Sequence, residues 1–399
     1  MQAKHLKLAV GLLVGLFGPF SAHAITDLLL QVPEELLDDA NSSYIFIFQD
    51  HVSAGEVRGQ ARHLTKQAGG VLRHVFSKAI KGFSATLSAA AAEKIAANPK
   101  IAYYEPNQIY WATARPLDTD DARFRAAPTG YGPGRDDDGE DEEPDQVTPW
   151  GIDRIGGPID GNNLHAWIID TGIDLDHPDL NVGEGANFVT LGNTPEEPDD
   201  DAGHGTHVAG TVAAIDNEID VVGVAPNATV HPVKVLSKSG FGMTDWIVAG
   251  IDYVAANAIA GDCANMSLGG LGHQESIHNA VVNAAALGIR FSLAAGNDGA
   301  DAAEYEPAHI DAENVFTISA IDSDDDFASF SNYGNPPIDF AAPGVDILST
   351  RLGGGVTTMQ GTSMAAPHVC GILLHRAIPA TDGYADEDPD HDPDPIAHQ

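Results

Sequence analysis

The stretch Gly361-Thr362-Ser363-Met364-Ala365-Ala366-Pro367 places a small-residue turn and a hydroxyl in front of an almost wholly apolar run at residues 368–375. That run predicts a buried helix, and we expect Pro367 in its first turn because a proline farther inside breaks the hydrogen-bond ladder. Ser363 then lies at a helix N-terminus, where free N–H groups favour a developing anion. A lone serine at this place is commonly only a helix cap, so a nucleophile needs support from the rest of the chain.

Short apolar runs alternate with helical patterns through residues 146–378. The apolar runs predict buried parallel strands at residues 164–169, 229–235, 264–268, 290–294 and 315–320. The patterns between several of them predict helices at residues 204–215, 244–258 and 275–287. This order predicts an α/β fold with a mainly parallel sheet and helices on both faces. Active sites in such folds lie at the carboxyl ends of strands.

Polar side chains follow two of these strands. Asp170 ends the first strand, His204 opens the first helix, and Asn297 follows the strand at residues 290–294. A carboxylate can orient an imidazole that takes the proton of Ser363, and an amide can donate to an oxyanion together with the N–H of that serine. Each residue taken alone has an ordinary explanation as a strand-end acid, a buried histidine or a turn former. Their combination predicts nucleophilic catalysis.

The motifs Asp170-Thr171-Gly172, His204-Gly205-Thr206-His207 and the stretch around Ser363 together resemble the subtilisin-like serine proteases, including the proteinase K branch. The order aspartate, histidine, serine distinguishes that family from chymotrypsin-like enzymes and α/β-hydrolases. The resemblance implies that Asp170 orients His204 and that His204 acts as general base and then acid. It further implies that Ser363 forms an acyl-enzyme and that Asn297 stabilises the oxyanion. The expected function is an endopeptidase that hydrolyses peptide bonds of proteins.

The same resemblance implies two walls of a specificity pocket and an edge strand that pairs with extended substrate. The residues at the matching places are Gly240, Phe241, Gly242, Ser267, Leu268, Gly269, Gly270, Ala294 and Gly296. Glycines leave the pocket open, and no carboxylate is dedicated to a basic side chain. We therefore expect broad specificity that favours apolar or aromatic residues before the cut bond.

The loop at residues 214–221 offers backbone carbonyls and an amide side chain, which are hard oxygen ligands suited to calcium. It resembles the strong calcium site of the subtilisin-like family. The resemblance implies that Ca²⁺ is bound by Gln146, Asp179, Ile215, Asn217, Ile219 and Val221. A solvated acidic loop is the alternative.

The N-terminal part carries a β-α-β-β-α-β pattern over residues 43–111, which predicts a small α+β ferredoxin-like domain. In this position it resembles the inhibitory propeptide of the subtilisin-like family, an intramolecular inhibitor and chaperone whose C-terminal end lies in the active site. The alternative is an unrelated small binding domain. Residues 25–42 show no clear period and are predicted to be a spacer.

Charge is divided unevenly in a chain whose net charge is −38. Residues 147–399 hold 38 acidic and 6 basic residues, whereas residues 52–100 hold 8 basic and 2 acidic residues. The two parts are electrostatically complementary, as docking of one on the other would require. An acidic catalytic domain argues against nucleic acid or an anionic membrane as partner. We expect protein and peptide substrates, the chain's own propeptide as inhibitor, and a monomer.

Residues 1–24 predict a secretory signal peptide, because two lysines precede the apolar run at residues 8–20 and Ala22-His23-Ala24 is a cleavage signal. The apolar run is too short for a comfortable transmembrane anchor, which is the alternative. The expected product is a secreted, extracellular protein made as a zymogen that processes itself.

Two further segments are acidic. The composition of residues 112–145 predicts a solvated linker in which processing occurs. Closely spaced prolines exclude a helix from residues 379–399, which predicts a disordered or loosely draped acidic tail. A second calcium-binding segment is the alternative for the tail.

Some questions stay open at the level of the sequence. Cys263 and Cys370 are equally consistent with a disulfide or with two buried thiols. A triad esterase is disfavoured because the serine lacks the G-x-S-x-G elbow. An inactive peptide-binding relative would show a damaged triad, and none is visible.

Overall fold

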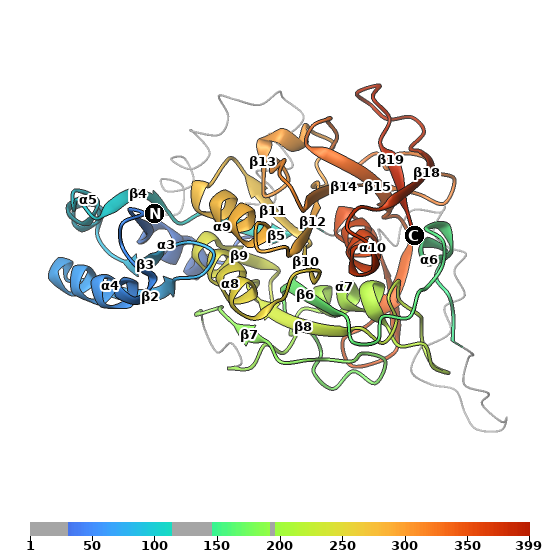
Figure 1. The fold of residues 1–399 in the computed structure, drawn as a ribbon, viewed down its shortest axis with the longest axis horizontal. Coiled ribbons are helices and arrows are strands. Elements are labelled where there is room, and N and C mark those ends of the chain that lie inside the picture. Colours follow the sequence, from blue (N-terminus) through green and yellow to red (C-terminus); the bar gives the residue numbers. More distant parts are fainter. Residues whose placement is uncertain (1–30, 114–145, 192–195) are drawn as a thin grey trace.

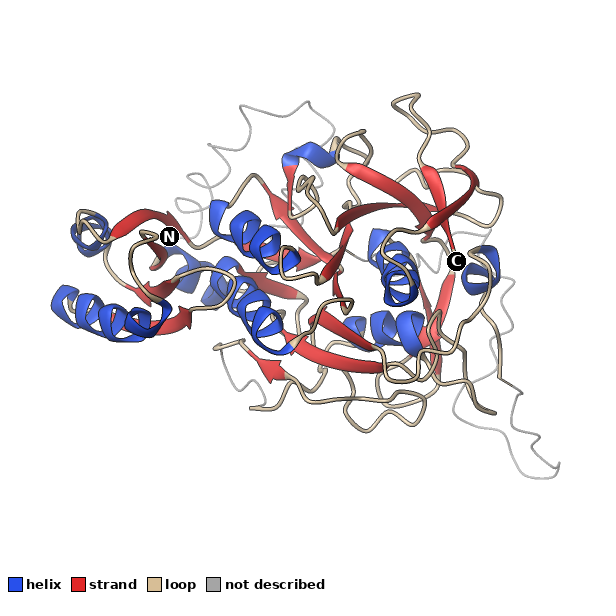
Figure 2. Ribbon diagram, viewed as in Figure 1, coloured by secondary structure: helices blue, strands red, loops and turns tan. Residues whose placement is uncertain are grey.

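In the computed structural model, the protein folds into a small N-terminal unit and a larger C-terminal unit (Figure 1). The structure describes residues 31–113, 146–191 and 196–399. The predicted signal peptide and nearly all of the predicted linker lie outside the described residues. Figure 2 shows that both units combine helices with sheets.

The small unit has the predicted ferredoxin-like order, with a four-stranded antiparallel sheet of order β2-β3-β1-β4. Its elements are β1 (Ser43–Phe48), α4 (Ala54–Ala68), β2 (Val71–Phe76), β3 (Gly82–Thr86), α5 (Ala89–Ala96) and β4 (Ile101–Pro106). Phe46, Val57, Leu64 and Ala92 belong to the apolar cluster between the helices and the sheet. Helices α4 and α5 therefore cover the sheet face that points away from the large unit (Figure 1).

Part of the predicted spacer is helical, which corrects the expectation for residues 25–42. Helix α3 (Glu34–Asn41) follows Pro33 and buries Leu36. The side chain of Asp39 bonds Arg73 of strand β2, so α3 is held by tertiary contacts. A helix of eight residues has little stability of its own, which explains why no local pattern revealed it.

The large unit is the predicted α/β fold, built on a nine-stranded sheet in which every neighbouring pair except β18 and β19 is parallel. From one edge to the other its strands are β18 (Ala380–Tyr384), β19 (Pro395–His398), β15 (Ile338–Pro343), β14 (Val315–Ile321), β12 (Arg290–Ala294), β10 (Cys263–Met266), β6 (His165–Asp170), β8 (Thr229–Lys234) and β7 (Ala186–Asn187).

Helices lie on both faces of this sheet, as predicted (Figure 1). Helices α7 (His204–Ala213) and α10 (Thr362–His375) pack together on one face, and α8 (Thr244–Asn257) and α9 (Glu275–Ala285) pack together on the other. Shorter elements complete the unit: α6 (Trp150–Arg154), the 3-10 turn η2 (Ala302–Glu304), and the hairpin of β16 (Ile347–Thr350) and β17 (Val356–Met359). No helix in the described part of the chain is long and apolar enough to cross a bilayer.

The C-terminal segment at residues 379–399 is ordered and paired with the main sheet, so the prediction of a disordered or loosely draped tail is wrong. Strands β18 and β19 form an antiparallel hairpin, and β19 extends the main sheet through the pair Ala341↔Ile396. Ile396 is fully buried, and the carboxylate of Asp394 accepts hydrogen bonds from Ser319 Oγ and Asn335 Nδ2. Pairing with β15 supplies the order that the proline-rich sequence does not show by itself.

A second, smaller sheet joins the two units. Its order is β13-β11-β5-β9, where β5 (Ile109–Ala112) follows the propeptide-like domain. The three other strands belong to the large unit: β9 (Phe241–Met243), β11 (Leu268–Leu271) and β13 (Tyr305–Glu306). The predicted linker therefore begins too early, because Ala112 is the last residue of a paired strand.

Helix α10 begins at Thr362, so Pro367 lies in its second turn and the prediction of a first-turn position is wrong. A proline there has no N–H for the carbonyl of Ser363, four residues earlier. The hydroxyl of Ser267 donates to that carbonyl instead, at 2.8 Å. A side chain from the residue between β10 and β11 therefore makes a hydrogen bond to this carbonyl in place of the missing one.

The open question about the cysteines is resolved, because Cys263 of β10 and Cys370 of α10 form a disulfide with a Cα–Cα distance of 5.7 Å. The bond joins the central sheet to the helix that carries Ser363 at its start.

Candidate active site

Asp170 and His204 are bonded to each other at the carboxyl end of β6. The main-chain carbonyl of Asp170 accepts from the N–H groups of Val235 and Leu236, which fixes the end of the strand. The side-chain oxygen Oδ1 of Asp170 lies 2.7 Å from His204 Nδ1 and accepts a hydrogen bond from the N–H of Thr171 at 2.7 Å. His204 Nδ1 is thus the nitrogen that donates, and Nε2 remains for chemistry.

The charge state of His204 follows from two opposed effects. Burial has the largest single effect and lowers its pKa, but the charge and hydrogen bond of Asp170 together with the charge of Asp200 outweigh it, so the pKa of His204 lies above the usual 6.5. Among the described residues, His204 Nε2 is buried without a hydrogen-bond partner. An acceptor nitrogen is therefore available in the cleft.

The start of α7 is held by Asp200, which the sequence analysis missed. Asp200 Oδ1 accepts from Thr171 Oγ1 and Gly203 N, and its Oδ2 accepts from the N–H and hydroxyl of Thr206. Gly205 lies so close to β6 that a Cβ there would be 2.1 Å from the carbonyl oxygen of Gly172. An aspartate four residues before His204 was the signal that could have revealed this positioning network.

Ser363 is the second residue of α10, and its side chain is engaged in two contacts. Ser363 Oγ donates to the carbonyl of Ser267 at 3.0 Å and lies 2.7 Å from Thr113 Oγ1. Because the single proton of Ser363 Oγ is given to Ser267, the hydroxyl of Thr113 is the donor in the second contact. The predicted hydrogen bond between His204 and Ser363 is not made in this arrangement.

Asn297 and Ser363 hold one carbonyl group between them. Asn297 Nδ2 and the N–H of Ser363 both donate to the carbonyl oxygen of Thr113, the second at 3.4 Å. Asn297 is itself oriented because its Oδ1 accepts from the N–H and the hydroxyl of Thr362, each at 2.9 Å. The two predicted oxyanion donors thus meet at a carbonyl of the chain itself. The family resemblance implied that the end of the propeptide lies in the active site, but the sequence did not show that the residue is Thr113.

The predicted substrate-binding residues surround strand β5. Gly240 O accepts from Ala112 N at 2.9 Å, and Ser267 O accepts from Thr113 N at 3.3 Å. The other pairs are Tyr110↔Gly242, Trp111↔Phe241, Trp111↔Gly269 and Ala112↔Leu268. A Cβ on Gly269 would lie 3.4 Å from Thr113 Cγ2, so a glycine leaves room beside that side chain.

The three remaining predicted residues lie farther along the cleft or behind it. Gly270 faces the fully buried ring of Tyr110, where a Cβ would lie 2.8 Å from ring atoms. Ala294 ends β12, and the N–H of Gly296 donates to Thr362 Oγ1 at 3.1 Å. Gly296 therefore supports the turn before Ser363.

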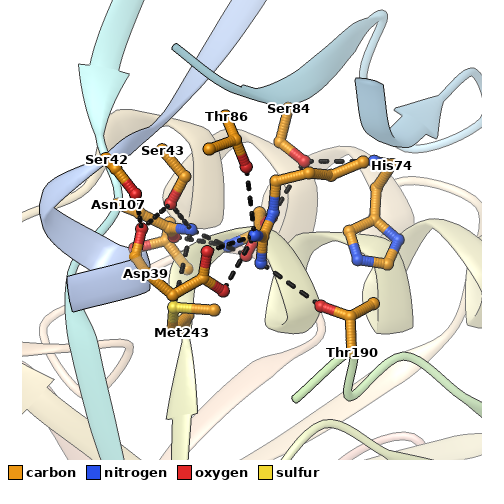
Figure 3. A network of polar contacts seen from close by, with 12 residues as sticks. Asp39, Ser42, Ser43, His74, Ser84, Thr86, Asn107, Thr190 and Met243 are labelled. Carbon is orange, nitrogen blue, oxygen red and sulfur yellow. Dashed lines mark hydrogen bonds and ion pairs between the residues drawn. The ribbon is translucent and has the colours of Figure 1, made fainter. Parts of the chain in front are cut away.

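An ion-pair network fastens the small unit to the large one (Figure 3). Arg73 donates to Asp245 of α8 at 2.7 Å and to Asp39 at 2.6 Å, and Asp245 also accepts from Asn107 and Ser84. Burial by itself raises the pKa of Asp245, but nearby positive charge and hydrogen bonds bring its pKa below the usual value. The ion pair of Arg73 and Asp245 is thus a buried contact in which a basic residue of the small unit meets an acidic residue of the large unit.

Two carboxylates add to this interface by binding main-chain N–H groups of the opposite unit. Asp252 of α8 accepts from the N–H groups of Ser77, Lys78 and Ala79. Glu105 of the small unit accepts from the first N–H groups of α9 at 2.7 and 3.1 Å. A helix N-terminus favours such a negative charge.

The six predicted calcium ligands lie together beside the end of α7. Gln146 Nε2 donates to the carbonyls of Ile215 and Val221, at 2.6 and 3.1 Å. Asn217 contacts the carboxylate of Asp179 at 2.7 Å and accepts from the N–H of Ile219. Burial raises the pKa of Asp179 to about 7. In this structure the amide nitrogens of Gln146 and Asn217 point at these oxygen atoms. The buried carboxylate, the carbonyls and, once the two amides turn, their oxygens form a set that fits a hard cation, which would favour the ionised carboxylate.

The site combines a hydroxyl at a helix N-terminus, an imidazole held by a carboxylate, and a segment of the same chain bound in the cleft. This combination defines a serine peptidase with a built-in inhibitor. The chain matches the Subtilase family over residues 162–379 and the Peptidase inhibitor I9 family over residues 41–112.

Individual relatives agree with these matches. The chain is similar to Subtilisin NAT of Bacillus subtilis subsp. natto, with 34% identity over 335 residues, covering 82% of this chain and 78% of the relative. It is also similar to the alkaline protease of Alkalihalobacillus alcalophilus, with 41% identity over 57% of this chain and 58% of the relative. The crystal structure of a cold adapted subtilisin-like serine proteinase matches 64% of this chain and 98% of its own, with 33% identity and a TM-score of 0.55.

The chain therefore belongs to the subtilase family and is a serine endopeptidase with an I9-type propeptide.

Proposed function

We propose that this zymogen cuts itself after Thr113 and that Asp170, His204, Ser363 and Asn297 perform the reaction. The observation that carries the proposal is the carbonyl of Thr113, which accepts from Asn297 Nδ2 and the N–H of Ser363. An acyl-transfer site needs two such donors where the oxyanion forms. Thr113 occupies the place of the residue before the cut bond.

The reaction begins with a change of partner at Ser363. Its hydroxyl turns from the carbonyl of Ser267 towards His204 Nε2, which has no hydrogen-bond partner among the residues that the structure describes. His204 takes the proton as Ser363 Oγ bonds to the carbonyl carbon of Thr113, and Asp170 stabilises the imidazolium. The negative oxygen is held by Asn297 and the Ser363 N–H. The proton then passes from His204 to the departing amine, and water releases the acyl group by the same steps.

We expect other substrates to bind in the same extended form and at the same place as strand β5. An extended peptide between β9 and β11 gains main-chain hydrogen bonds that do not depend on its side chains. Gly269 leaves space beside the residue before the cut bond, and Tyr110, three residues before Thr113, fills a buried site. These features support broad specificity that favours apolar or aromatic residues. Mass spectrometry of cleavage sites in a denatured protein mixture tests this, and a strict requirement for a basic residue would contradict it.

We also propose that calcium stabilises the enzyme. The carbonyls of Ile215, Ile219 and Val221 and the side chains of Gln146, Asp179 and Asn217 would hold the ion. Bound calcium contributes stability by mass action, because only the folded chain assembles this set. Removing calcium should lower the melting temperature of the wild type and have a smaller effect on Asp179→Asn. Equal melting curves with and without chelator would remove the calcium proposal.

The proposal places the enzyme outside the cell as a monomer. The disulfide between Cys263 and Cys370 supports an oxidising compartment. Export is tested by fusing residues 1–24 to a reporter enzyme, which should then be found outside the cytoplasm. Sedimentation of the Ser363→Ala protein at several concentrations tests the monomer, and a mass that rises with concentration would contradict it.

The roles of Ser363 and His204 are tested by self-cleavage of the purified full-length precursor, and the role of Asn297 by hydrolysis of a denatured protein by the mature enzyme. Ser363→Ala and His204→Ala should each abolish acyl transfer while the protein stays folded. Asn297→Ala should lower kcat by about 100- to 1,000-fold with a small change in KM, because its donor acts mainly on the transition state.

A further inference from the structure

A cluster of metal-binding side chains lies beside the substrate cleft and has no part in the proposed reaction. His273, Glu306 and His309 each offer one ligand atom, and these atoms all lie within 4.8 Å of one another. His273 is in the turn between β11 and α9, whereas Glu306 ends β13 and His309 follows it. Two segments of chain, the turn around His273 and residues 306–309, therefore contribute to one spot.

Glu306 is the buried member of the cluster. Its side chain is fully buried, and its Oε2 accepts from the N–H of Gln274 at 3.0 Å. Its other oxygen, Oε1, is buried without a hydrogen-bond partner in the described part of the chain. Burial raises the pKa of Glu306 to about 8. A buried carboxylate oxygen without a partner is costly unless a proton or a cation is bound to it.

The imidazoles crowd around this carboxylate. The rings of His273 and His309 have centroids 4.2 Å apart, and His309 Nδ1 lies 3.5 Å from Glu306 Oε2 and 3.2 Å from the carbonyl of Tyr305. Nδ1 of a further ring, His278, lies 3.3 Å from His309 Nε2. Imidazole nitrogens and a buried carboxylate thus share one small volume.

We propose that His273, Glu306 and His309 bind one Zn²⁺ ion. Two imidazoles and one carboxylate are a donor set that suits zinc and does not suit calcium. Ligand atoms around tetrahedral zinc stand about 3.3 Å apart, so the cluster must contract by about 1.5 Å at most. His273 is exposed and lies in a turn, and it has the freedom to move inward. The fourth position is left to water or to His278.

An ion at this position would link two strands of the smaller sheet. Strand β11 pairs with β13 through Gly270↔Glu306 and with β5 through Leu268↔Ala112. A zinc ion would tie the turn after β11 to β13 and so brace the wall on which the peptide lies. The bound ion should raise the melting temperature of the protein.

The experiment uses the full-length chain with Ser363→Ala to prevent self-digestion, without a histidine tag, stripped of zinc and saturated with calcium. Titration calorimetry with Zn²⁺ should show one equivalent bound, and Co²⁺ in its place should give the visible absorption of a tetrahedral ion. Glu306→Gln and His273→Ala should each weaken Zn²⁺ binding by about 100-fold or more, since loss of a ligand exceeds loss of a supporting contact.

A matched control is the other histidine pair, His165 and His231, whose ring nitrogens are 3.0 Å apart on the main sheet. His165→Asn should leave Zn²⁺ binding unchanged. Glu306→Gln changes only one atom of the side chain, and its zinc-free melting temperature should equal or exceed that of the parent. The proposal is overturned if the parent binds no equivalent of Zn²⁺, if Glu306→Gln binds it as tightly as the parent, or if His165→Asn is the variant that loses it.

Discussion

Ser267 and Ser363 exchange hydrogen bonds: Ser267 Oγ donates to the carbonyl of Ser363 at 2.8 Å, and Ser363 Oγ donates to the carbonyl of Ser267 at 3.0 Å. The first bond exists because Pro367 has no N–H for that carbonyl, and the second holds the nucleophile away from His204. Ser267, which links β10 to β11, therefore holds both the backbone and the side chain of the catalytic residue.

Ser267→Ala should affect catalysis as well as stability. The variant leaves the buried carbonyl of Ser363 without its donor, which costs about 1–3 kcal/mol of unfolding free energy and shifts the nucleophile. We expect a lower melting temperature and a fall in kcat. The matched control is Ser292→Ala, because Ser292 Oγ donates to the carbonyl of Ala366 in the same helix at 2.8 Å. Ser292→Ala should lose similar stability but keep kcat, and an unchanged kcat in Ser267→Ala would argue against this coupling.

The pH dependence of kcat/KM should follow His204. Its imidazole must be neutral to accept a proton, so activity is lost as pH falls through its pKa. Burial lowers this pKa, and Asp170 together with Asp200 raises it above 6.5. Release of the propeptide reduces the burial, which moves the midpoint further upward. The acid limb of the mature enzyme should therefore have its midpoint above 6.5, and Asp170→Asn should shift it downward while lowering kcat. An acid limb below 6.5 in the wild type would contradict this assignment.

Arg73→Ala should speed release of the cleaved propeptide. The side chain of Arg73 is 9% exposed and that of Asp245 is fully buried. Removing one partner of a buried pair costs about 3–5 kcal/mol, so dissociation should accelerate about 100-fold or more. The rate at which activity appears after self-cleavage measures this. Arg62→Ala is the control because Arg62 is exposed, and equal release rates for the two variants would contradict a dominant role for the buried pair.

Replacing both cysteines by alanine should destabilise the large unit. The disulfide joins Cys263 and Cys370 across 107 residues, and a loop of that size corresponds to about 4–5 kcal/mol in the chain-entropy description. Urea unfolding of the Ser363→Ala protein at fixed calcium concentration measures the change. A loss below about 1 kcal/mol would show that the bond adds little to contacts already made by β10 and α10.

Thr113→Val should speed self-cleavage. The hydroxyl of Thr113 donates to Ser363 Oγ and helps to hold it away from His204. Loss of one such hydrogen bond corresponds to about 0.5–1.5 kcal/mol, or about a two- to tenfold faster first cut. Thr113→Ser keeps the hydroxyl and serves as the control. Slower processing of the valine variant would mean that the hydroxyl assists the reaction.

The central strands and the catalytic motifs could be predicted because their signals are local. Apolar runs such as residues 290–294 are buried on both faces and read as strands without further information. Asp170 and His204 were expected to meet because both lie at the carboxyl edge of the sheet, and they do so at 2.7 Å.

Features that depend on distant contacts were missed. Strand β19 is ordered by pairing with β15, and α3 is held through Arg73, neither of which leaves a local pattern. The rotamer of Ser363 depends on the Thr113 hydroxyl, and the second-turn position of Pro367 depends on Ser267. In each case the partner lies far away in the sequence, so residue spacing alone carries no trace of it.

The most direct test of the account is the mass of the N-terminal fragment released by the purified full-length precursor. The account predicts a fragment whose last residue is Thr113, formed at a rate independent of protein concentration and absent from Ser363→Ala. A first cut at any other bond, or normal cleavage of purified Ser363→Ala, would contradict it.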